Sequence, residues 1–572
     1  SQTASRMAAL VDRFDDQYAN TLILAGGDNF LPGPFLAAGT DPSVINALNK
    51  VTGSTFAANA TVPIAAADIA IHNIIGVQAS TIGNHEFDLG SRVLNDAIVP
   101  TATYQGALFP YLSANLDFSG DADIGRRFTN TTTQAGLEQA SSLNGRIAPS
   151  AIIEQGGEKI GLVGATTQLL NSISSPSGTT VIGSSVDNMD LLAAQLQPVI
   201  DDLRNQGVNK IILMAHLQNL DNERLLATKL KGVDIILAAG SNTRLGDADD
   251  VAVEFPGHAA NFADTYPVVI KDADGNNTLL VNTDNEFTYL GRLVVDFDAQ
   301  GNILLNSLPE NATINGAYAS TDENVAAAYG DDIDQAYAEG TKGGDVKLLT
   351  DAVQDVIATK DGNVYGFSNV YLEGERANVR SEETNLGNLT ADANGYALAL
   401  ALGTQSDSTY IVSLKNGGGI RAQIGTLSAP NADGTVDKLP PDGGGSQLDV
   451  ENSRRFNNQL MAFDTTAAGL KAILEHSVAA GTLQGRFPQL GTLPSQQCPS
   501  PSTRRASTAV PEPEPKRCWL PRRLAFRASR RTQANWTRWC WTWRRRSSGA
   551  ATPVWSGWPA SRPTGDHLVT SG

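Results

Sequence analysis

Six consecutive residues in the first fifth of the chain, 83–88 with the sequence GNHEFD, constrain the fold more than any other segment. They follow the apolar segment 76–82, which has the composition of a buried strand. The end of a strand is the usual place for active-site groups in an α/β fold. Asn84 offers an oxygen ligand for a metal ion, His85 an imidazole for proton transfer, and Asp88 a carboxylate that orients this imidazole. The segment therefore predicts a catalytic loop rather than a turn with a helix cap.

Three other segments support the same interpretation. Asp28 follows the apolar residues 21–24, and His216 follows the apolar residues 210–213. Residues 416–421 read NGGGIR, a loop whose glycines let the backbone approach a ligand closely. GNHEFD and NGGGIR in one chain, at this separation, are a more specific signal of a protein family than either segment alone. On these residues the chain resembles the 5′-nucleotidase family of dinuclear metallophosphoesterases, over most of its length before the last eighty residues.

The resemblance implies an α/β (α+β) fold. A metallophosphoesterase double-sheet sandwich flanked by helices is expected, with a second, smaller α/β substrate-binding domain. The residue pattern agrees, because strands and helices alternate before a polar helical stretch. The expected parts are a catalytic domain lacking its amino-terminal motif (1–307), a helical connector (308–366), an incomplete 5′-nucleotidase C-terminal substrate-binding domain (367–493) and a tail (494–572).

Apolar periodicity predicts the individual elements. The expected helices span 5–14, 64–75, 191–204, 221–230, 322–339, 345–357, 385–402 and 467–480. The expected strands span 20–25, 79–82, 152–153, 160–163, 210–215, 233–237, 266–270, 278–282, 290–297 and 410–414. Together they predict two packed sheets flanked by helices.

The charge distribution limits the partners. Residues 1–493 hold 57 acidic and 28 basic side chains, which argues against a nucleic-acid partner because phosphate backbones demand basic faces. The excess of acid fits a secreted protein. No run approaches the roughly 18 apolar residues of a membrane span. The chain starts at Ser1 inside an expected helix, so we interpret it as a fragment, and the lack of a visible signal peptide is uninformative.

The tail 494–572 differs from the rest of the chain. It holds 14 basic and 3 acidic residues, together with all seven Trp and all three Cys. One interpretation is a basic, aromatic arm that binds membranes or nucleic acid. The other is a disordered or frameshifted segment, which we favour because the family pattern stops in the middle of the segment 485–490.

By resemblance, the catalytic domain binds two divalent metal ions. Asp28, Asn84, His216 and Asn242 are the implied metal ligands. His85 is the implied catalytic residue, which assists departure of the leaving oxygen while Asp88 holds its tautomer. Mixed nitrogen and oxygen ligands permit Zn, Mn, Fe or Ca.

Two departures from the family pattern weaken one metal site. Where the family carries GHSH or GHSQ, this chain reads Gly240-Ser241-Asn242, so the first histidine is missing and Asn242 is a substitute ligand. The earliest family motif, Asp-x-His, would lie before Ser1. His258 is either a compensating ligand or, as we expect, an ordinary surface histidine.

The second domain carries the implied substrate-binding residues. The family pattern assigns its arginines to the anionic end of the substrate, its loop residues to the same pocket, and Phe456 and Asn458 to the nucleobase. These residues are Arg376, Arg380, Asn416, Gly418, Arg421, Phe456 and Asn458. Core packing is the alternative role of Phe456.

The expected function is metal-dependent hydrolysis of phosphate monoesters, above all nucleoside 5′-monophosphates, by a periplasmic or extracellular enzyme. The alternatives are a broad alkaline phosphatase, a 2′,3′-cyclic phosphodiesterase, or a catalytically degenerate nucleotide-binding protein. The partner is a small-molecule phosphate ester, and the sequence defines no oligomeric state.

Overall fold

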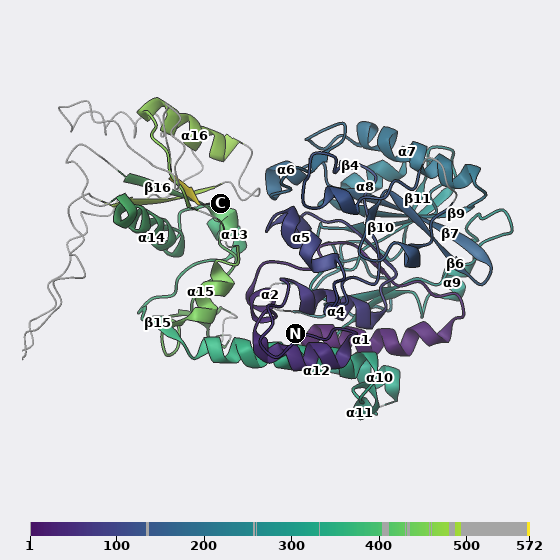
Figure 1. Cartoon of the computed structure of the whole chain (residues 1–572), viewed down its shortest axis with the longest axis horizontal. Helices are drawn as coiled ribbons and strands as arrows, with labels where there is room; N and C mark the ends of the chain where they lie inside the picture. The colour runs from purple at the N-terminus through teal and green to yellow at the C-terminus, as the bar shows by residue number, and fades with distance from the viewer. Residues whose placement is uncertain are drawn as a thin grey trace, which may run out of the picture. The chain divides into compact units, whose positions relative to one another are not determined.

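The computed structural model describes residues 2–132, 137–255, 258, 260–330, 332–402, 411–429, 431, 435–456, 458, 460–479, 487–493 and 569–571. The chain divides into two compact units, residues 1–359 and 360–572 (Figure 1). The boundary lies near the end of helix α12 (Lys342–Asp361), inside the predicted connector. Most of the predicted tail, 494–568 and 572, lies outside the described residues.

The larger sheet of the first unit has six strands in the order β11-β12-β10-β9-β7-β6. The central strands β12, β10, β9 and β7 are parallel, while β11 and β6 pair antiparallel at the two edges. The strands span β6 Ser150–Gln155, β7 Glu158–Thr166, β9 Lys210–His216, β10 Ile235–Ala239, β11 Val268–Lys271 and β12 Asn277–Val281.

The smaller sheet of this unit is parallel throughout and has the order β1-β2-β3-β5. Its strands span β1 Leu24–Ala25, β2 Ala79–Thr81, β3 Tyr111–Leu112 and β5 Ile147–Ala148. An apolar cluster that includes Ala79, Leu112, Leu162 and Met214 joins the two sheets. This contact confirms the predicted double-sheet sandwich.

Helices cover the outer face of the six-stranded sheet (Figure 1). Helix α7 (Met189–Asn205) begins at Asn188, whose side chain accepts a hydrogen bond from the backbone N–H of Leu191. Buried apolar residues of α7, and of α8 (Leu220–Ala227), pack against β7, β9 and β10. Burial of this apolar stripe stabilises the layer that presents the strand ends.

The segment 308–359 belongs to the first unit. Helix α1 (Gln2–Phe14) packs on α10 (Asp322–Tyr329) through buried Ala9, Leu10 and Val325, and Arg6 forms an ion pair with Asp322 at 2.6 Å. The predicted helix 322–339 is broken at Gly330, which has a φ of 66°. The chain then resumes as the short helix α11 (Ile333–Ala336).

The other elements of the first unit frame these layers. Its remaining helices are α2 Pro34–Ala38, α3 Ile45–Val51, α4 Ala66–Ile75, α5 Ser91–Ile98, α6 Leu170–Ile173 and α9 Ser307–Glu310. Its remaining strands are β4 Leu116–Asp117, β8 Thr180–Val181, β13 Tyr289–Arg292 and β14 Gly316–Ala319.

The second unit is a smaller α/β body, as predicted. Its main sheet has the order β20-β22-β16-β21, and the long helix α14 packs on it through Leu398 beside Ile411 and Leu414. Its helices are α13 Arg376–Val379, α14 Asn385–Leu402, α15 Gln447–Ser453 and α16 Ala467–Ala479. Its strands are β15 Val364–Gly366, β16 Ile411–Asn416, β17 Thr426–Leu427, β18 Lys438–Leu439, β19 Gly445–Ser446, β20 Leu460–Met461, β21 Pro488–Leu493 and β22 Val569–Ser571.

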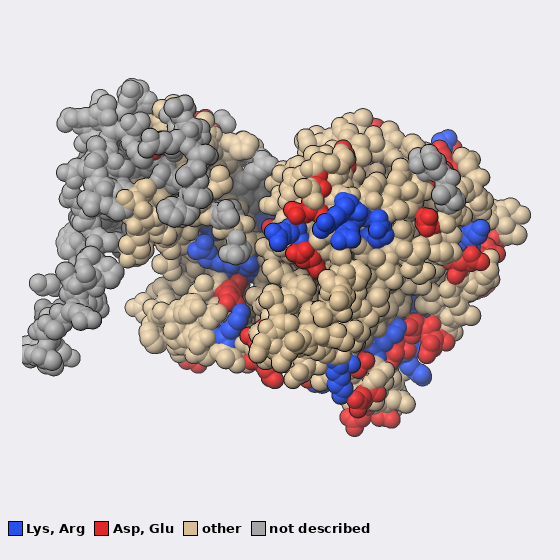
Figure 2. Space-filling view, viewed as in Figure 1, with Lys and Arg blue, Asp and Glu red and all other residues tan. Residues whose placement is uncertain are grey.

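In the described part of the chain, no helix is long and apolar enough to cross a membrane. On the face of the molecule shown in Figure 2, lysines and arginines lie in small groups next to acidic side chains.

Candidate active site

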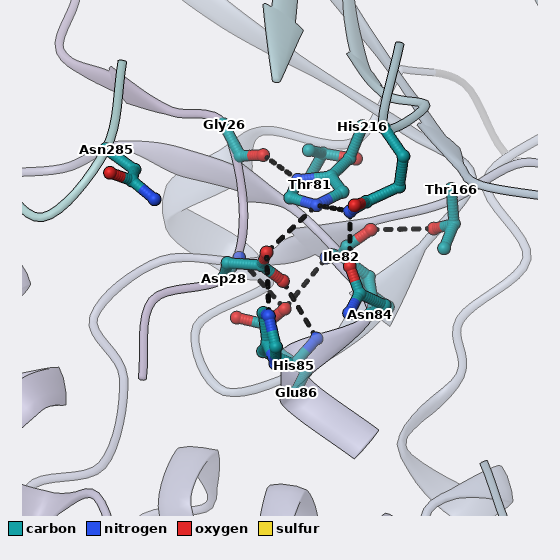
Figure 3. Close-up of polar contacts among 12 residues, drawn as sticks. Gly26, Asp28, Thr81, Ile82, Asn84, His85, Glu86, Thr166, His216 and Asn285 are labelled. Atoms are coloured by element: carbon teal, nitrogen blue, oxygen red, sulfur yellow. Dashed lines mark hydrogen bonds and ion pairs between the residues drawn. The ribbon is translucent and has the colours of Figure 1, made fainter. Parts of the chain in front are cut away.

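Asp28, Asn84 and His216 meet where the carboxyl ends of the two sheets come together (Figure 3). Asp28 follows β1, Asn84 follows β2, and His216 is the last residue of β9. The Nε2 atom of His216 lies 3.1 Å from Oδ2 of Asp28. Oδ1 of Asp28 accepts a hydrogen bond from the backbone N–H of His85 at 2.8 Å. Three of the four predicted metal ligands are therefore brought together.

His216 is fixed in orientation by its second ring nitrogen. Nδ1 donates to the carbonyl of Gly26 at 2.7 Å, so that Nε2 points at Asp28. Burial lowers the pKa of His216, but the charge and hydrogen bond of Asp28, the hydrogen bond to Gly26 and the charge of Glu86 together raise this pKa to about 9. Burial likewise raises the pKa of Asp28, while His216 and His85 together lower it to about 2. Asp28 and His216 thus form an ion pair.

His85 and Asp88 form the predicted imidazole–carboxylate pair. His85 is the first residue of the 3₁₀ turn η3 (His85–Phe87), and its Nδ1 is hydrogen-bonded to Oδ2 of Asp88. The other carboxylate oxygen, Oδ1, accepts a hydrogen bond from Oγ of Ser174 at 2.8 Å. With Nδ1 engaged, Nε2 of His85 lies 4.0 Å from Oδ2 of Asp28. Nε2 of His85, the nitrogen available for proton transfer, therefore lies on the side of the candidate metal ligand Asp28.

Glu86 is a functional residue that the sequence prediction missed. Its side chain is fully buried, and its carboxylate accepts hydrogen bonds from three backbone N–H groups. The donors are Asp28 at 3.0 Å, Asn29 at 2.6 Å and Gly83 at 2.8 Å. Glu86 thereby ties the loop after β1 to the loop after β2. The glutamate within the GNHEFD segment was the signal available in the sequence.

Strained backbone marks the loops that carry these groups. Asp28, Gln218 and Asn242 have positive φ angles of 55°, 67° and 55°, and they follow β1, β9 and β10. Non-glycine residues adopt this region at a cost of about 1–3 kcal/mol, and such residues cluster at active sites and ligand clamps. The strained residues therefore lie in loops that follow the carboxyl ends of strands in both sheets.

Asn242, the fourth predicted ligand, follows β10, and its Oδ1 accepts a hydrogen bond from Nδ2 of Asn285 at 2.9 Å. Figure 3 labels Asn285 in the view of the group around Asp28. Gly240, two residues before Asn242, touches this group directly. A Cβ built on Gly240 would lie 2.6 Å from Nε2 of His216 and 2.7 Å from Nε2 of Gln218.

The donor set fits one divalent ion. The carboxylate of Asp28, Nε2 of His216 and Oδ1 of Asn84 supply oxygen and nitrogen donors at one point, and Gln218 contacts both of the latter. Among the described residues, no group of three or more His, Cys, Asp and Glu could hold a metal ion. The fit therefore depends on the amide oxygen of Asn84 as the third donor.

The second unit gathers most of the predicted substrate-binding residues. The Cζ atom of Arg421 lies 5.3 Å from the centroid of the Phe456 ring, and its Nη1 donates to the carbonyl of Gly418 at 3.5 Å. Burial, and then the nearby charges of Arg376 and Arg421, lower the pKa of Arg380 to about 10. The three arginines are thus close enough to repel one another. Three neighbouring guanidinium groups of this kind can bind an anion.

The remaining predicted residues of this unit differ in exposure. Oδ1 of Asn416 is buried without a hydrogen-bond partner in the part of the chain that the structure describes. Asn458 is exposed to solvent. Lys415, which the sequence prediction missed, is only 3% exposed. Burial, and then the charge of Arg454, lower the pKa of Lys415 to about 8.

Comparison of the chain with known proteins also finds similarity to 5′-nucleotidases. A family model described as 5′-nucleotidase, C-terminal domain, matches residues 359–503. The 5′-nucleotidase of Mus musculus is 30% identical over 437 residues, which cover 73% of this chain and 60% of the relative. A snake venom 5′-nucleotidase from Gloydius brevicauda is 28% identical and covers 72% of this chain and 62% of the relative. The structure of a 5′-nucleotidase precursor from Thermus thermophilus has a TM-score of 0.58 at 26% identity, over 85% of this chain and 75% of that structure.

The chain belongs to the 5′-nucleotidase family. It spans about three fifths of the length of the curated 5′-nucleotidases that it matches. The first unit carries the GNHEFD loop of this family, and the second carries its NGGGIR loop. Gly240 stands where the resemblance led us to expect a histidine, and the side-chain amide of Gln218 lies against that glycine.

Two histidines outside this site are accounted for locally. His72 is buried in α4, where its Nδ1 contacts the carbonyl of Asp68 at 2.8 Å. His258 differs from the predicted surface histidine, because its side chain is only 13% exposed and pairs with Asp284 at 2.9 Å. The hydrogen bond to Asp284 raises the pKa of His258 to about 9. The partner of His258 in this ion pair is therefore Asp284, which is not one of the predicted metal ligands.

Proposed function

We propose that this protein hydrolyses phosphate monoesters, with nucleoside 5′-monophosphates as its main substrates. The observation that carries the proposal is the meeting of Asp28, Asn84 and His216 beside the His85–Asp88 pair. Ligand donors and a proton-transfer group in one place are what ester hydrolysis requires. The names of the sequence relatives support this reaction.

We propose that the reaction depends on divalent metal ions, drawn from Zn, Mn, Fe and Ca. Asp28, Asn84 and His216 would hold one ion. A divalent ion bound there neutralises phosphoryl charge and lowers the pKa of a water molecule. A second ion would use Asn242, which contributes a single amide oxygen, so this position has less support from the residues present.

His85 then acts on the leaving group. Its Nδ1 is engaged by Asp88, so Nε2 carries the exchangeable proton when the ring is charged. Donation of this proton to the departing ester oxygen avoids the release of an alkoxide. Asp88 fixes the direction of the ring, and Ser174 in turn holds Asp88. His85 and Asp88 are therefore the proposed acid and its positioning partner.

The second unit is proposed to bind the rest of the nucleotide. Arg376, Arg380 and Arg421 offer charge for the anionic end, with Asn416 and Gly418 in the same pocket. Phe456 presents a ring for stacking on a base, and Asn458 is exposed for contact with its edge. Core packing is a poor account of Phe456, because its ring lies against a guanidinium.

A second candidate is a nucleotide-binding protein with little turnover. The absence of a side chain at Gly240, and the engagement of Asn242 by Asn285, favour it. Broad phosphomonoesterase and 2′,3′-cyclic phosphodiesterase activities are further variants of the leading proposal. We also propose a periplasmic or extracellular location, supported by the venom origin in one relative's name.

One assay series separates these proposals. The purified chain, loaded with Mn²⁺ or Zn²⁺, is given AMP, 2′,3′-cyclic AMP and p-nitrophenyl phosphate, and released phosphate is measured. The leading proposal expects the highest kcat/KM on AMP, loss of activity with a chelator, and loss of activity in the Asp28→Ala variant. Binding of AMP without turnover supports the second candidate instead. Undiminished hydrolysis by Asp28→Ala overturns the assignment of the site.

A further inference from the structure

Gln218 lies against two of the three candidate metal ligands. Its side-chain amide contacts Oδ1 of Asn84 and lies 2.9 Å from Nε2 of His216. The residue follows β9 by two positions and has a positive φ of 67°. A glutamine in this region has a strained backbone, and such strain persists only where the surrounding structure imposes it. The neighbouring structure holds the amide in place.

Gly240 provides the space that this amide fills. A Cβ at position 240 would lie 2.6 Å from Nε2 of His216 and 2.7 Å from Nε2 of Gln218, so one of these groups would have to shift. In the observed position, Gln218 from the loop after β9 therefore occupies volume that a side chain after β10 would otherwise need.

We propose that Gln218 is a metal ligand, which supplies its Oε1 atom as the fourth donor beside Asp28, Asn84 and His216. The inference rests on the metal dependence in the proposed function. It assigns a residue that the sequence pattern does not, and it gives the site three oxygen donors and one nitrogen.

The chemistry of an amide lets one side chain serve either as a hydrogen-bond donor or as a metal ligand. The NH₂ group of Gln218 faces Oδ1 of Asn84, and its nitrogen lies 2.9 Å from Nε2 of His216. A half-turn about the last side-chain bond exchanges Nε2 and Oε1 without a change of shape. Oε1 would then be the atom that the amide offers to an ion beside Asp28, Asn84 and His216. A site with mostly oxygen donors favours harder cations such as Mn²⁺ over Zn²⁺.

Two substitutions separate a ligand oxygen from a hydrogen-bond donor. Gln218→Glu keeps the oxygen and removes the NH₂ group, whereas Gln218→Leu removes both at similar size. Gln218→Gly removes the amide and relieves the positive φ, which provides a second test if the leucine variant folds poorly. Gln206→Leu is the matched control, because the amide of Gln206 is hydrogen-bonded to Asp202 at 3.0 Å on the far end of α7.

The measurement is direct binding of Mn²⁺ and of Zn²⁺ to the purified full chain by calorimetry, with metal content checked by mass spectrometry. We expect Gln218→Leu and Gln218→Gly to raise the Kd for Mn²⁺ about tenfold or more, on the scale of lost metal-site groups. Gln218→Glu should keep the Kd within about threefold of the wild type or lower it, on the same scale. Gln206→Leu should leave the Kd unchanged.

The outcomes distinguish this inference from the proposed function. Equal weakening by the Glu and Leu variants would show that the NH₂ group matters and would overturn the ligand role. An unchanged Kd in the Leu and Gly variants also overturns it, while the metal-dependent function stands. A wild-type chain that binds no divalent ion overturns the metal centre itself.

Discussion

The carboxylate of Asp28 accepts a hydrogen bond from the backbone N–H of His85 at 2.8 Å, which fixes the distance between the first ligand and the imidazole. The two residues are 57 positions apart in the chain. Gly83 makes this approach possible, because a Cβ at that position would overlap the carboxylate of Asp28. The glycine of the GNHEFD segment is therefore required by a close contact between loops.

Gly83→Ala should disrupt the site. The added methyl group forces Asp28 or the loop after β2 to move, at a cost of about 1–3 kcal/mol for an overpacked position. We expect phosphate release from AMP to fall by about a hundredfold, since small displacements of reacting groups have effects of this size. Thermal unfolding and steady-state kinetics measure the two effects.

The control is Gly366→Ala, because a Cβ on Gly366 meets no atom within 4 Å. This variant should change neither kcat nor the unfolding temperature. A Gly83→Ala enzyme with wild-type kcat would show that the contact with Asp28 is unimportant for the reaction.

Glu86→Gln should loosen both ligand loops. The substitution replaces one acceptor oxygen with an NH₂ group that faces backbone N–H donors of Asp28, Asn29 or Gly83. The expected cost is about 1–3 kcal/mol of stability for unsatisfied buried polar groups. Metal affinity should fall by about 10–100-fold, as for other groups that hold ligands in place. Calorimetric titration with Mn²⁺ measures this change, and an unaltered Kd contradicts the positioning role.

The sequence predicted those parts of the fold that depend on local patterns. The helix at Met189–Asn205 and the strand at Lys210–His216 differ from their predicted ranges by a few residues at most, because apolar periodicity determines both. The predicted strand 290–297 is shorter, with β13 ending at Arg292, because its pairing with β14 ends there. Local periodicity contains no information about a distant partner strand.

The candidate site was predictable where a motif names the residue. Asp28, Asn84, His85 and Asp88 follow strands, and His216 ends one, where these strands meet at one edge. The role of Gln218 could not be predicted, because it depends on a missing side chain at Gly240 in another loop. The burial of Lys415 was missed for a similar reason, since the residue lies in β16 between strands that come from distant parts of the chain. Such contacts exist only after the chain has folded.

His85→Ala should lower kcat on AMP by about 10²–10⁴-fold, the usual contribution of a positioned acid or base. KM should change little, because the imidazole acts on the departing oxygen rather than on the bound nucleotide. Asp88→Asn should have a smaller effect of about tenfold, since the ring stays but loses its charged partner. Steady-state kinetics test both, and an Asp88→Asn loss as large as that of His85→Ala contradicts this division of roles.

Phe456→Ala should raise KM for AMP about tenfold with little change in kcat. A stacked base contributes equally to the bound substrate and to the transition state, at about 1–3 kcal/mol. Phe367→Ala in the same unit is the control, because Phe367 is 85% exposed. Similar KM values for the two variants would leave base stacking at Phe456 without support. Inorganic pyrophosphate, which has no base, should inhibit the wild type and the Phe456→Ala variant equally.

Asp68→Asn should remove a pH-dependent cost from the first unit. Oδ2 of Asp68 is buried and has no hydrogen-bond partner among the described residues, and burial raises the pKa of Asp68 to about 8. The folded protein therefore binds this proton more tightly than the unfolded chain, whose aspartate has a pKa near 4. Below about pH 4 the carboxyl is protonated in both states, so Asp68 does not reduce the free energy of unfolding. As the pH rises from about 4 to about 8, the free energy of unfolding falls by up to about 1.4 kcal/mol per pH unit.

Unfolding free energies of the wild type and of Asp68→Asn, measured by urea titration from pH 4 to pH 8, test this expectation. The difference between the two proteins should grow with pH in favour of the variant, because only the wild type must either ionise a buried carboxyl or bind a proton on folding. Asp96→Asn serves as the control, since the side chain of Asp96 is 54% exposed. Two parallel stability curves for the wild type and Asp68→Asn would contradict the shifted pKa, because a group with the same proton affinity in both states adds no slope.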